Sequence, residues 1–452
     1  MGIREELEDA RARTLELALD LSDAQWMGPR LDIVNPMRWE LGHLAWFQEL
    51  WTLRRPHGAA SIRADGAASI RADASASLRA DADALYDSAA VAHHTRWDLP
   101  LPDRSATLEY LSCVLARSLD RIPRPGGLQP SQAEPANPAA ERAARPYFHR
   151  LALFHEDMHG EALTYTRQTL AYAAPRALVT ASPAERADAN RGALPGDALV
   201  PAARYLLGAT PQEPFVFDNE KWAHPVDVAA FRIARAPVTN EEYLRFVAAG
   251  GYETPTHWSL AGWRWRTAVG AHHPVYWQRE AGVFCVRRYD RLAPIEPHQP
   301  VEHVCAHEAD AYCRWAQRRL PREAEWELAA STPDKRRYPW GDAPPTPAQA
   351  NLDCRFGGPV DVAAFAAGDS AYGCRQMIGN VWEWTASDLR PFPGFVVDPY
   401  KEYSEPWFST PHRILRGGCW ATRARLLRNT WRNFYPPDRR DVLAGFRTCA
   451  LP

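Results

Sequence analysis

Apolar residues recur at helical spacing in three stretches of the first part of the chain. Leucines and aromatic residues follow this spacing over residues 3–55, and similar periods follow at Ser105–Arg121 and Tyr147–Ala171. Positions three and four residues apart lie on one face of a helix, so each stretch can bury an apolar stripe against the others. The pattern predicts a helical bundle over residues 1–180.

Two segments interrupt the helical pattern. Residues 61–84 repeat one eight-residue unit as SIRADGAA, SIRADASA and SLRADADA, which is too short for the unit of a repeat protein. Pro123–Pro146 is rich in proline and is typical of a loop. We expect the repeat to be a mobile insertion without chemistry and the second segment to be irregular.

The composition and the hydrophobic pattern of the chain change after about residue 199. Residues 181–198 are rich in Ala, Pro and Arg and are predicted to be a linker. Beyond them, Gly, Pro and aromatic residues are closely interleaved, with short helical patterns at Asn240–Ala248, Ala306–Arg318 and Arg322–Ala330. The sequence therefore predicts a two-domain α+β protein, with an irregular α+β domain over residues 199–452.

Composition narrows the possible partners. The 452 residues are 46% hydrophobic and 24% charged, with a net charge of −2, so no general affinity for nucleic acid is expected. No apolar run is long enough to span a bilayer, and the N-terminus lacks the apolar centre of a secretory signal. We expect a cytoplasmic protein without a membrane partner, whose eight cysteines, lacking any C-x-x-C pair, are reduced core residues.

Histidines in the bundle suggest a metal site. His155 and His159 are four residues apart, which places both imidazoles on one face of a helix. His43 lies in the apolar stretch WELGHLAWFQEL, where an imidazole needs a partner or a metal ion. Three histidines with open positions beside them suit Fe(II) and Zn(II) equally.

The same residues allow different interpretations. The string H-E-x-x-H is the pattern of a zinc protease, in which Glu156 is the general base, but no H-x-x-G-x-x-H extension follows. The histidine spacing is also compatible with two imidazoles on a solvated helix face that bind no metal ion. The second domain could also be a non-catalytic binding module, because irregular α+β domains of this kind also serve as binding scaffolds.

The histidines and the second domain together resemble a known family. His43 with His155 and His159 resembles the iron-binding, DinB-like four-helix bundle of the ergothioneine-pathway sulfoxide synthases, the EgtB family. The second half resembles the formylglycine-generating-enzyme fold, a C-type-lectin-like α+β domain, through motifs that occur in family order. These motifs are Asp218–Glu220, Pro237–Asn240, Arg319–Glu327, Tyr338–Gly341, Gly379–Trp384, Leu415–Trp420 and Gly445–Arg447.

The resemblance implies an Fe(II)- and O2-dependent enzyme that joins a sulfur or selenium donor to hercynine and oxidises the chalcogen. His43, His155 and His159 are then the metal ligands. In the family, the catalytic phenol lies in a P-Y-x-E-Y segment, which implies Tyr400 as proton donor and Tyr403 as an active-site hydroxyl.

Substrate contacts follow from the same resemblance. The hercynine carboxylate ligand corresponds to Asn433, and the aromatic face of Phe434 suits a quaternary ammonium. Members that use γ-glutamylcysteine have an acid where this chain has Tyr435, and two arginines where it has His93 and Arg96.

These differences from the family pattern lie at positions that bind the chalcogen donor. The glutamine of the family's ligand helix is also replaced, by Met158. An uncharged sugar needs neither an acid nor an arginine fork, so the chain resembles the selenoneine synthases, the selenosugar-using branch of the family. The alternative donor is a thiol, γ-glutamylcysteine or cysteine, as in ergothioneine synthesis.

Overall fold

The computed structural model describes residues 2–54, 77–123, 138–175 and 178–452. The chain forms two compact units, Met1–Thr166 and Arg167–Pro452, and passes from one to the other within the last turn of the helix α6.

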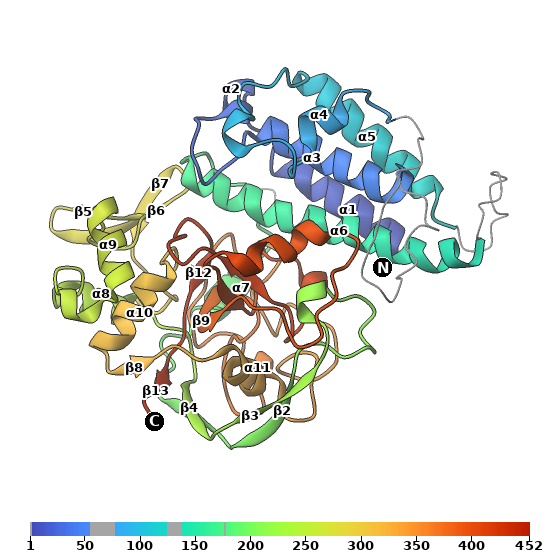
Figure 1. Cartoon of the computed structure of the whole chain (residues 1–452). Coiled ribbons are helices and arrows are strands. Elements are labelled where there is room, and N and C mark those ends of the chain that lie inside the picture. The colour runs from blue at the N-terminus through green and yellow to red at the C-terminus, as the bar shows by residue number, and fades with distance from the viewer. Residues whose placement is uncertain (1, 55–76, 124–137, 176–177) are drawn as a thin grey trace. The chain divides into compact units, whose positions relative to one another are not determined.

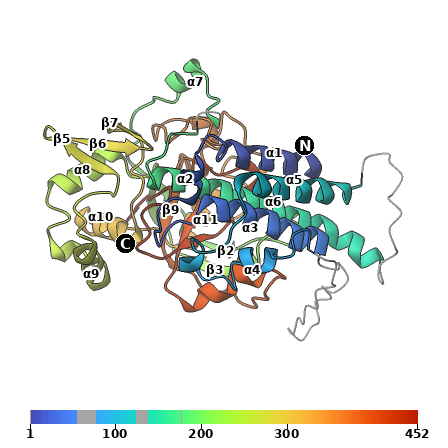
Figure 2. The same cartoon turned by 90° about the horizontal axis from the view of Figure 1, so that it is seen from above.

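The N-terminal unit is helical. Its four long helices lie side by side in both views (Figures 1 and 2), which confirms the expected four-helix bundle. Trp26, Trp39 and Trp51 are fully buried within it. The helices of this unit are α1 (Ile3–Glu16), α2 (Asp23–Met27), α3 (Met37–Glu49), α4 (Ala82–Tyr86), α5 (Arg104–Asp120) and α6 (Pro138–Thr169).

Two expectations about the interruptions need correction. The helix α6 begins at Pro138 and continues through Pro146, so the end of the expected loop is helical, while 124–137 lie outside the described residues. The Ala, Glu and Arg residues after Pro138 have high helix propensity, which compensates for one interior proline.

The expectation of a mobile insertion does not hold for the last copy of the repeat. Residues 61–76 lie outside the described part of the chain, but the last copy packs on the bundle. There Ser77 and Leu78 donate to the Glu49 carboxylate, and Asp83 accepts from the Trp46 indole at 2.6 Å.

The C-terminal unit is an α+β domain with several small sheets (Figure 1). The sheet orders are β1-β4-β13-β8, β11-β10-β9-β12, β2-β3 and β5-β6-β7. The strands are β1 (Asp197–Val200), β2 (Ala203–Leu207), β3 (His224–Val228), β4 (Phe231–Ala234), β5 (Trp277–Glu280), β6 (Val283–Arg288), β7 (Arg291–Pro294), β8 (Arg318–Arg319), β9 (Trp382–Asp388), β10 (Arg413–Arg416), β11 (Asn433–Tyr435), β12 (Ala444–Gly445) and β13 (Cys449–Ala450).

Helices form at the three segments that the periodicity predicts, 240–248, 306–315 and 323–331, and at two segments that it did not predict, 183–188 and 260–269. The helices are α7 (Pro183–Asp188), α8 (Asn240–Ala248), α9 (Leu260–Val269), α10 (Ala306–Trp315) and α11 (Glu323–Ser331). The segment expected as a linker carries α7 and packs on the C-terminal unit, because Arg355 bonds to Glu185 at 2.5 Å.

Buried ion pairs hold the motif segments of this unit together. Arg447 donates two hydrogen bonds to Glu383, which also accepts from the Trp326 indole at 2.7 Å. Arg432 bonds to Glu323 in the same way. A buried charge needs such a partner, so these arginines fix where β9, β11 and α11 lie.

Six of the eight cysteines are buried, as expected for core residues, whereas Cys113 and Cys285 are half-buried. None of the eight, all of which lie within the described residues, forms a disulfide.

Candidate metal centre

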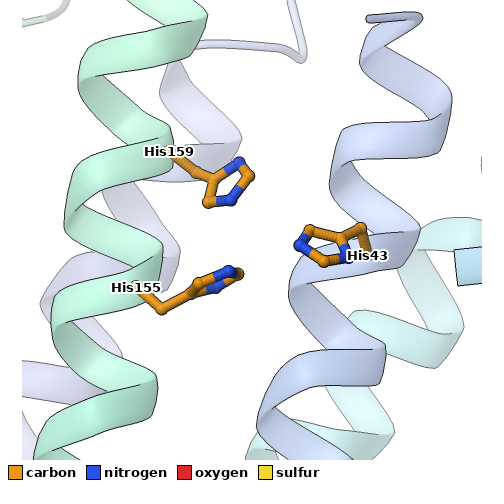
Figure 3. Close-up of side chains that lie close together, drawn as sticks. All are labelled: His43, His155 and His159. Carbon is orange, nitrogen blue, oxygen red and sulfur yellow. The ribbon is translucent and has the colours of Figure 1, made fainter. Parts of the chain in front are cut away.

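Three imidazoles converge inside the bundle. His43 on α3 faces His155 and His159 on α6, and one ring nitrogen of each lies within 4.8 Å of the others (Figure 3). His43 and His155 are almost fully buried, whereas the His159 side chain is 21% exposed. This arrangement can hold a metal ion and leave one side open.

The hydrogen bonds of two candidate ligands fix the role of their Nδ1 atoms. His43 Nδ1 lies 2.8 Å from the carbonyl oxygen of Tyr86, and His159 Nδ1 lies 2.5 Å from the Glu40 carboxylate. Both partners only accept hydrogen bonds when Glu40 is ionised, so each Nδ1 carries a hydrogen, and in a neutral imidazole Nε2 then keeps a lone pair. A metal ion needs that lone pair, so the residues present fit one.

The electrostatics favour the neutral forms of His43 and His155. Burial, reinforced by the charge of His159, lowers the pKa of His43 to about 3. Burial likewise lowers the pKa of His155 well below its usual value. Burial would raise the pKa of Glu40, but the charge and hydrogen bond of His159 outweigh it and lower that pKa to about 2.

A glycine allows the His43 contact to form. A Cβ on Gly42 would lie 2.5 Å from the Tyr86 hydroxyl oxygen and closer still to two carbons of its ring. Gly42 therefore lets α4 approach α3 closely enough for the Tyr86 carbonyl to reach His43.

Aromatic rings surround the ligands. Trp39 stacks on His43 with centroids 4.8 Å apart and planes at 9°, and Phe47 stacks on His155 at 3.5 Å and 5°. These rings limit the rotamers of the two imidazoles and keep the centre rigid.

Buried hydrogen-bond donors hold the Glu156 carboxylate. Arg11 donates to both of its carboxylate oxygens, at 2.8 and 3.1 Å, and Thr14 donates at 2.9 Å. Glu156 and Arg11 are both almost fully buried. A carboxylate held by three donors is not free to activate water, which argues against the zinc-protease alternative.

The residues expected near the donor are held within the bundle. His93 Nε2 lies 2.7 Å from the Val34 carbonyl oxygen. Arg96 is buried and donates to Asn35 at 2.7 Å and to the Val91 carbonyl at 3.2 Å. Met158 is half-buried on α6, one residue before the ligand His159.

The phenols expected to be catalytic gather in the C-terminal unit. Tyr400 and Tyr403 have ring centroids 6.3 Å apart. Tyr403 stacks on Phe217 at 4.1 Å and accepts a hydrogen bond from the Trp431 indole at 3.2 Å. Burial raises the pKa of Tyr403 above its usual value, so its phenol stays protonated.

The strand β11 places the expected hercynine residues beside these phenols. Phe434 meets Tyr403 edge-on, with centroids 6.3 Å apart. Asn433 is half-buried and its side-chain oxygen accepts from the backbone N–H of Phe434. The guanidinium of Arg439 lies over the Tyr435 ring at 5.4 Å. The structure thus brings Tyr400, Tyr403 and Phe434 into one cluster.

Sequence reasoning missed the partners of the ligands. Glu40 precedes His43 by three residues, so both lie on one face of α3. That spacing, with an acid in an apolar helix, is the signal that indicates an acceptor for a ligand imidazole. The carbonyl of Tyr86 leaves no such signal.

Comparisons with known proteins agree with this architecture. A DinB superfamily model matches residues 6–163, and a model of the sulfatase-modifying factor enzyme 1-like domain matches residues 182–450. The formylglycine-generating enzyme of Thermomonospora curvata is 30% identical over 57% of this chain and 94% of its own. The fold therefore defines a DinB-like bundle joined to a sulfatase-modifying-factor domain.

Relatives that match over nearly the whole chain specify the family. The hercynine oxygenase of Mycolicibacterium thermoresistibile is 37% identical, covering 98% of this chain and 93% of its own length. That of Mycolicibacterium smegmatis is 36% identical, covering 98% and 97%. The chain belongs to the hercynine oxygenase family, which confirms the EgtB-like resemblance.

The relatives bear less directly on the donor. Their name agrees better with the ergothioneine-pathway alternative than with a selenium donor, and it does not itself say which chalcogen is used.

Within the described residues, no helix has both the length and the apolar character to cross a bilayer.

Proposed function

We propose that the protein catalyses the Fe(II)- and O2-dependent coupling of a chalcogen donor to the imidazole carbon of hercynine. The observation that carries this proposal is the convergence of three imidazoles in a chain of the hercynine oxygenase family. His43, His155 and His159 would hold the iron, which supplies a site for O2 and for the donor.

The overall change balances without a further reductant. Hercynine loses its imidazole C–H hydrogen and the donor loses its S–H or Se–H hydrogen. One oxygen atom of O2 leaves as water with these two hydrogens, and the other ends on the oxidised sulfur or selenium. Hercynine and the donor thus supply all four electrons.

Residues of this chain have separate tasks in the proposal. The family resemblance assigns proton donation during oxygen reduction to Tyr400 and an active-site hydroxyl to Tyr403, which Trp431 holds in place. Phe434 would face the trimethylammonium group and Asn433 would bind the carboxylate.

A selenosugar donor is supported by a specific observation. The two terminal nitrogens of Arg96 donate to Asn35 and to the Val91 carbonyl, and His93 Nε2 lies 2.7 Å from the Val34 carbonyl oxygen. Neither side chain offers a free arginine fork to a dipeptide carboxylate, and Tyr435 offers no acid to its amino group. A donor without charged ends fits this set best, with γ-glutamylcysteine or cysteine as the rival.

Anaerobic loading with Fe(II), followed by hercynine, O2 and one donor at a time, tests both parts. We expect O2 uptake and a product whose mass equals both substrates plus one oxygen and minus two hydrogens. Each missing charged contact should lower kcat/KM for γ-glutamylcysteine about tenfold relative to a selenosugar. If no donor is consumed, the proposed activity is wrong; if the dipeptide is preferred, only the selenium assignment is wrong. His43→Ala serves as the metal-free control.

A further inference from the structure

Arg96 lies at one end of a continuous chain of hydrogen bonds that ends on a candidate metal ligand. Its Nη1 donates to Asn35 Oδ1 at 2.7 Å. The Asn35 amide nitrogen donates to Glu40 Oε1, and the other carboxylate oxygen, Oε2, lies 2.5 Å from His159 Nδ1.

Each link of this chain has a single direction. A guanidinium only donates, so the amide of Asn35 must turn its oxygen toward Arg96 and its nitrogen toward Glu40. An ionised carboxylate only accepts, so His159 must carry its hydrogen on Nδ1. With Nδ1 as the donor, Nε2 is the ring nitrogen of His159 that can bind a metal ion.

Arg96 also reaches a second ligand through packing. Its guanidinium carbon lies 3.7 Å from the centroid of the Trp39 ring, and Trp39 stacks on His43 at 4.8 Å. Trp39 is itself held by a hydrogen bond of 2.7 Å from its indole to the Leu85 carbonyl. Arg96 therefore contacts the supports of two of the three histidines.

We propose that Arg96 is a positioning residue for the metal centre, acting on His159 through Asn35 and Glu40 and on His43 through Trp39. It takes the place of a residue that the family resemblance assigns to donor binding. Lysine cannot replace it, because an ammonium lacks the planar fork that stacks on Trp39 while bonding to Asn35. The inference rests on the proposed metal centre.

Co(II) titration of the full-length apoprotein tests the inference without relying on turnover. The ligand-field absorbance of bound Co(II) reports both affinity and geometry. We expect Arg96→Met to weaken Co(II) binding about tenfold, the lower end for loss of a hydrogen bond that supports a ligand. Arg96→Lys should not restore it.

Arg104 provides a matched control. Its guanidinium carbon also lies over a tryptophan ring, that of Trp26 at 4.5 Å, and it donates to the Leu21 carbonyl. No hydrogen bond that the structure describes links Arg104 to a candidate ligand. Arg104→Met should therefore leave Co(II) affinity unchanged.

A second variant guards against misfolding. Asn35→Leu cuts the hydrogen-bond chain between Arg96 and Glu40 while keeping the arginine, so it should reproduce most of the loss of affinity. Circular dichroism of each apoprotein checks that the bundle is folded. If Arg96→Met cannot fold, the Co(II) affinity of Asn35→Leu decides whether the hydrogen-bond chain positions His159.

The outcomes separate the inference from the proposed function. If the unchanged protein binds no Co(II), the metal centre itself is wrong. If it binds Co(II) and the folded Arg96 and Asn35 variants bind equally well, only the positioning role is wrong. A higher donor KM with unchanged Co(II) affinity would instead make Arg96 a donor-binding residue.

Discussion

Replacement of Gly42 by alanine should damage the metal centre more than the fold. The added Cβ would lie 2.5 Å from the Tyr86 hydroxyl oxygen and closer to the ring carbons Cε1 and Cζ. Carbon atoms in contact are about 3.5 Å apart, so Tyr86 must withdraw by roughly 1 Å or more. Its carbonyl oxygen, now 2.8 Å from His43 Nδ1, would then lose that bond.

Two opposing terms set the effect on stability. Overpacking of a buried contact costs about 1–3 kcal/mol, whereas alanine is about 1 kcal/mol better than glycine inside a helix. The net loss is therefore about 0–2 kcal/mol. Loss of the hydrogen bond that orients a ligand typically weakens metal binding about 10–100-fold, which equals about 1.4–2.7 kcal/mol.

Gly160 supplies the control for this experiment. It follows the ligand His159 directly on α6, but a Cβ there would contact only Leu17 Cδ1 at 3.8 Å, an ordinary packing distance. Gly160→Ala should leave metal affinity unchanged and stabilise the helix by about 1 kcal/mol. Co(II) titration and thermal unfolding of both apoproteins measure the two quantities. Equal affinities for Gly42→Ala and the unchanged protein would refute the link between Tyr86 and His43.

Three further predictions concern buried or reactive groups. Glu156→Gln should lower the unfolding free energy by about 3 kcal/mol, because it leaves Arg11 without its buried counter-charge, yet metal stoichiometry should stay unchanged; loss of metal would contradict the structural role. Tyr400→Phe should lower kcat about 10²-fold or more with little change in hercynine KM. If Tyr403→Phe lowers kcat more than Tyr400→Phe does, Tyr403 is the proton donor and Tyr400 is the second hydroxyl. The pKa of His43 is lowered from its usual 6.5 to about 3, so the unfolded chain binds more protons in this range. Apoprotein stability should therefore fall as pH drops from about 6.5 to 3, and His43→Phe should flatten that slope in chemical denaturation at several pH values.

The three histidines of the candidate metal centre could be identified from the sequence because each leaves a local signal. His155 and His159 share a helix face through their spacing, and His43 is polar in an apolar helix. Their supports are harder to identify. Glu40 shares a face of α3 with His43, but it bonds to His159, and Asn35 bonds to Arg96; both contacts join segments far apart in the chain.

The C-terminal unit was predictable through motifs more than through periodicity. Strands such as β8 and β12 have only two residues each, too short for an alternating pattern, and β5–β7 were not anticipated. The motif arginines instead mark buried ion pairs, as with Arg447 and Glu383. Such pairs depend on long-range packing, so spacing along the chain does not reveal them.

The helix α3 contributes most of the side chains of the candidate metal centre. It contributes His43 itself, the Glu40 carboxylate that orients His159, and the Trp39 ring against His43. Because these three side chains lie within two turns of one helix, a shift of α3 along α6 would disturb two ligands together. Substitutions that loosen α3 should therefore reduce metal affinity in a non-additive way, whereas substitution of Glu156, which pairs with Arg11 of α1, should act on stability alone.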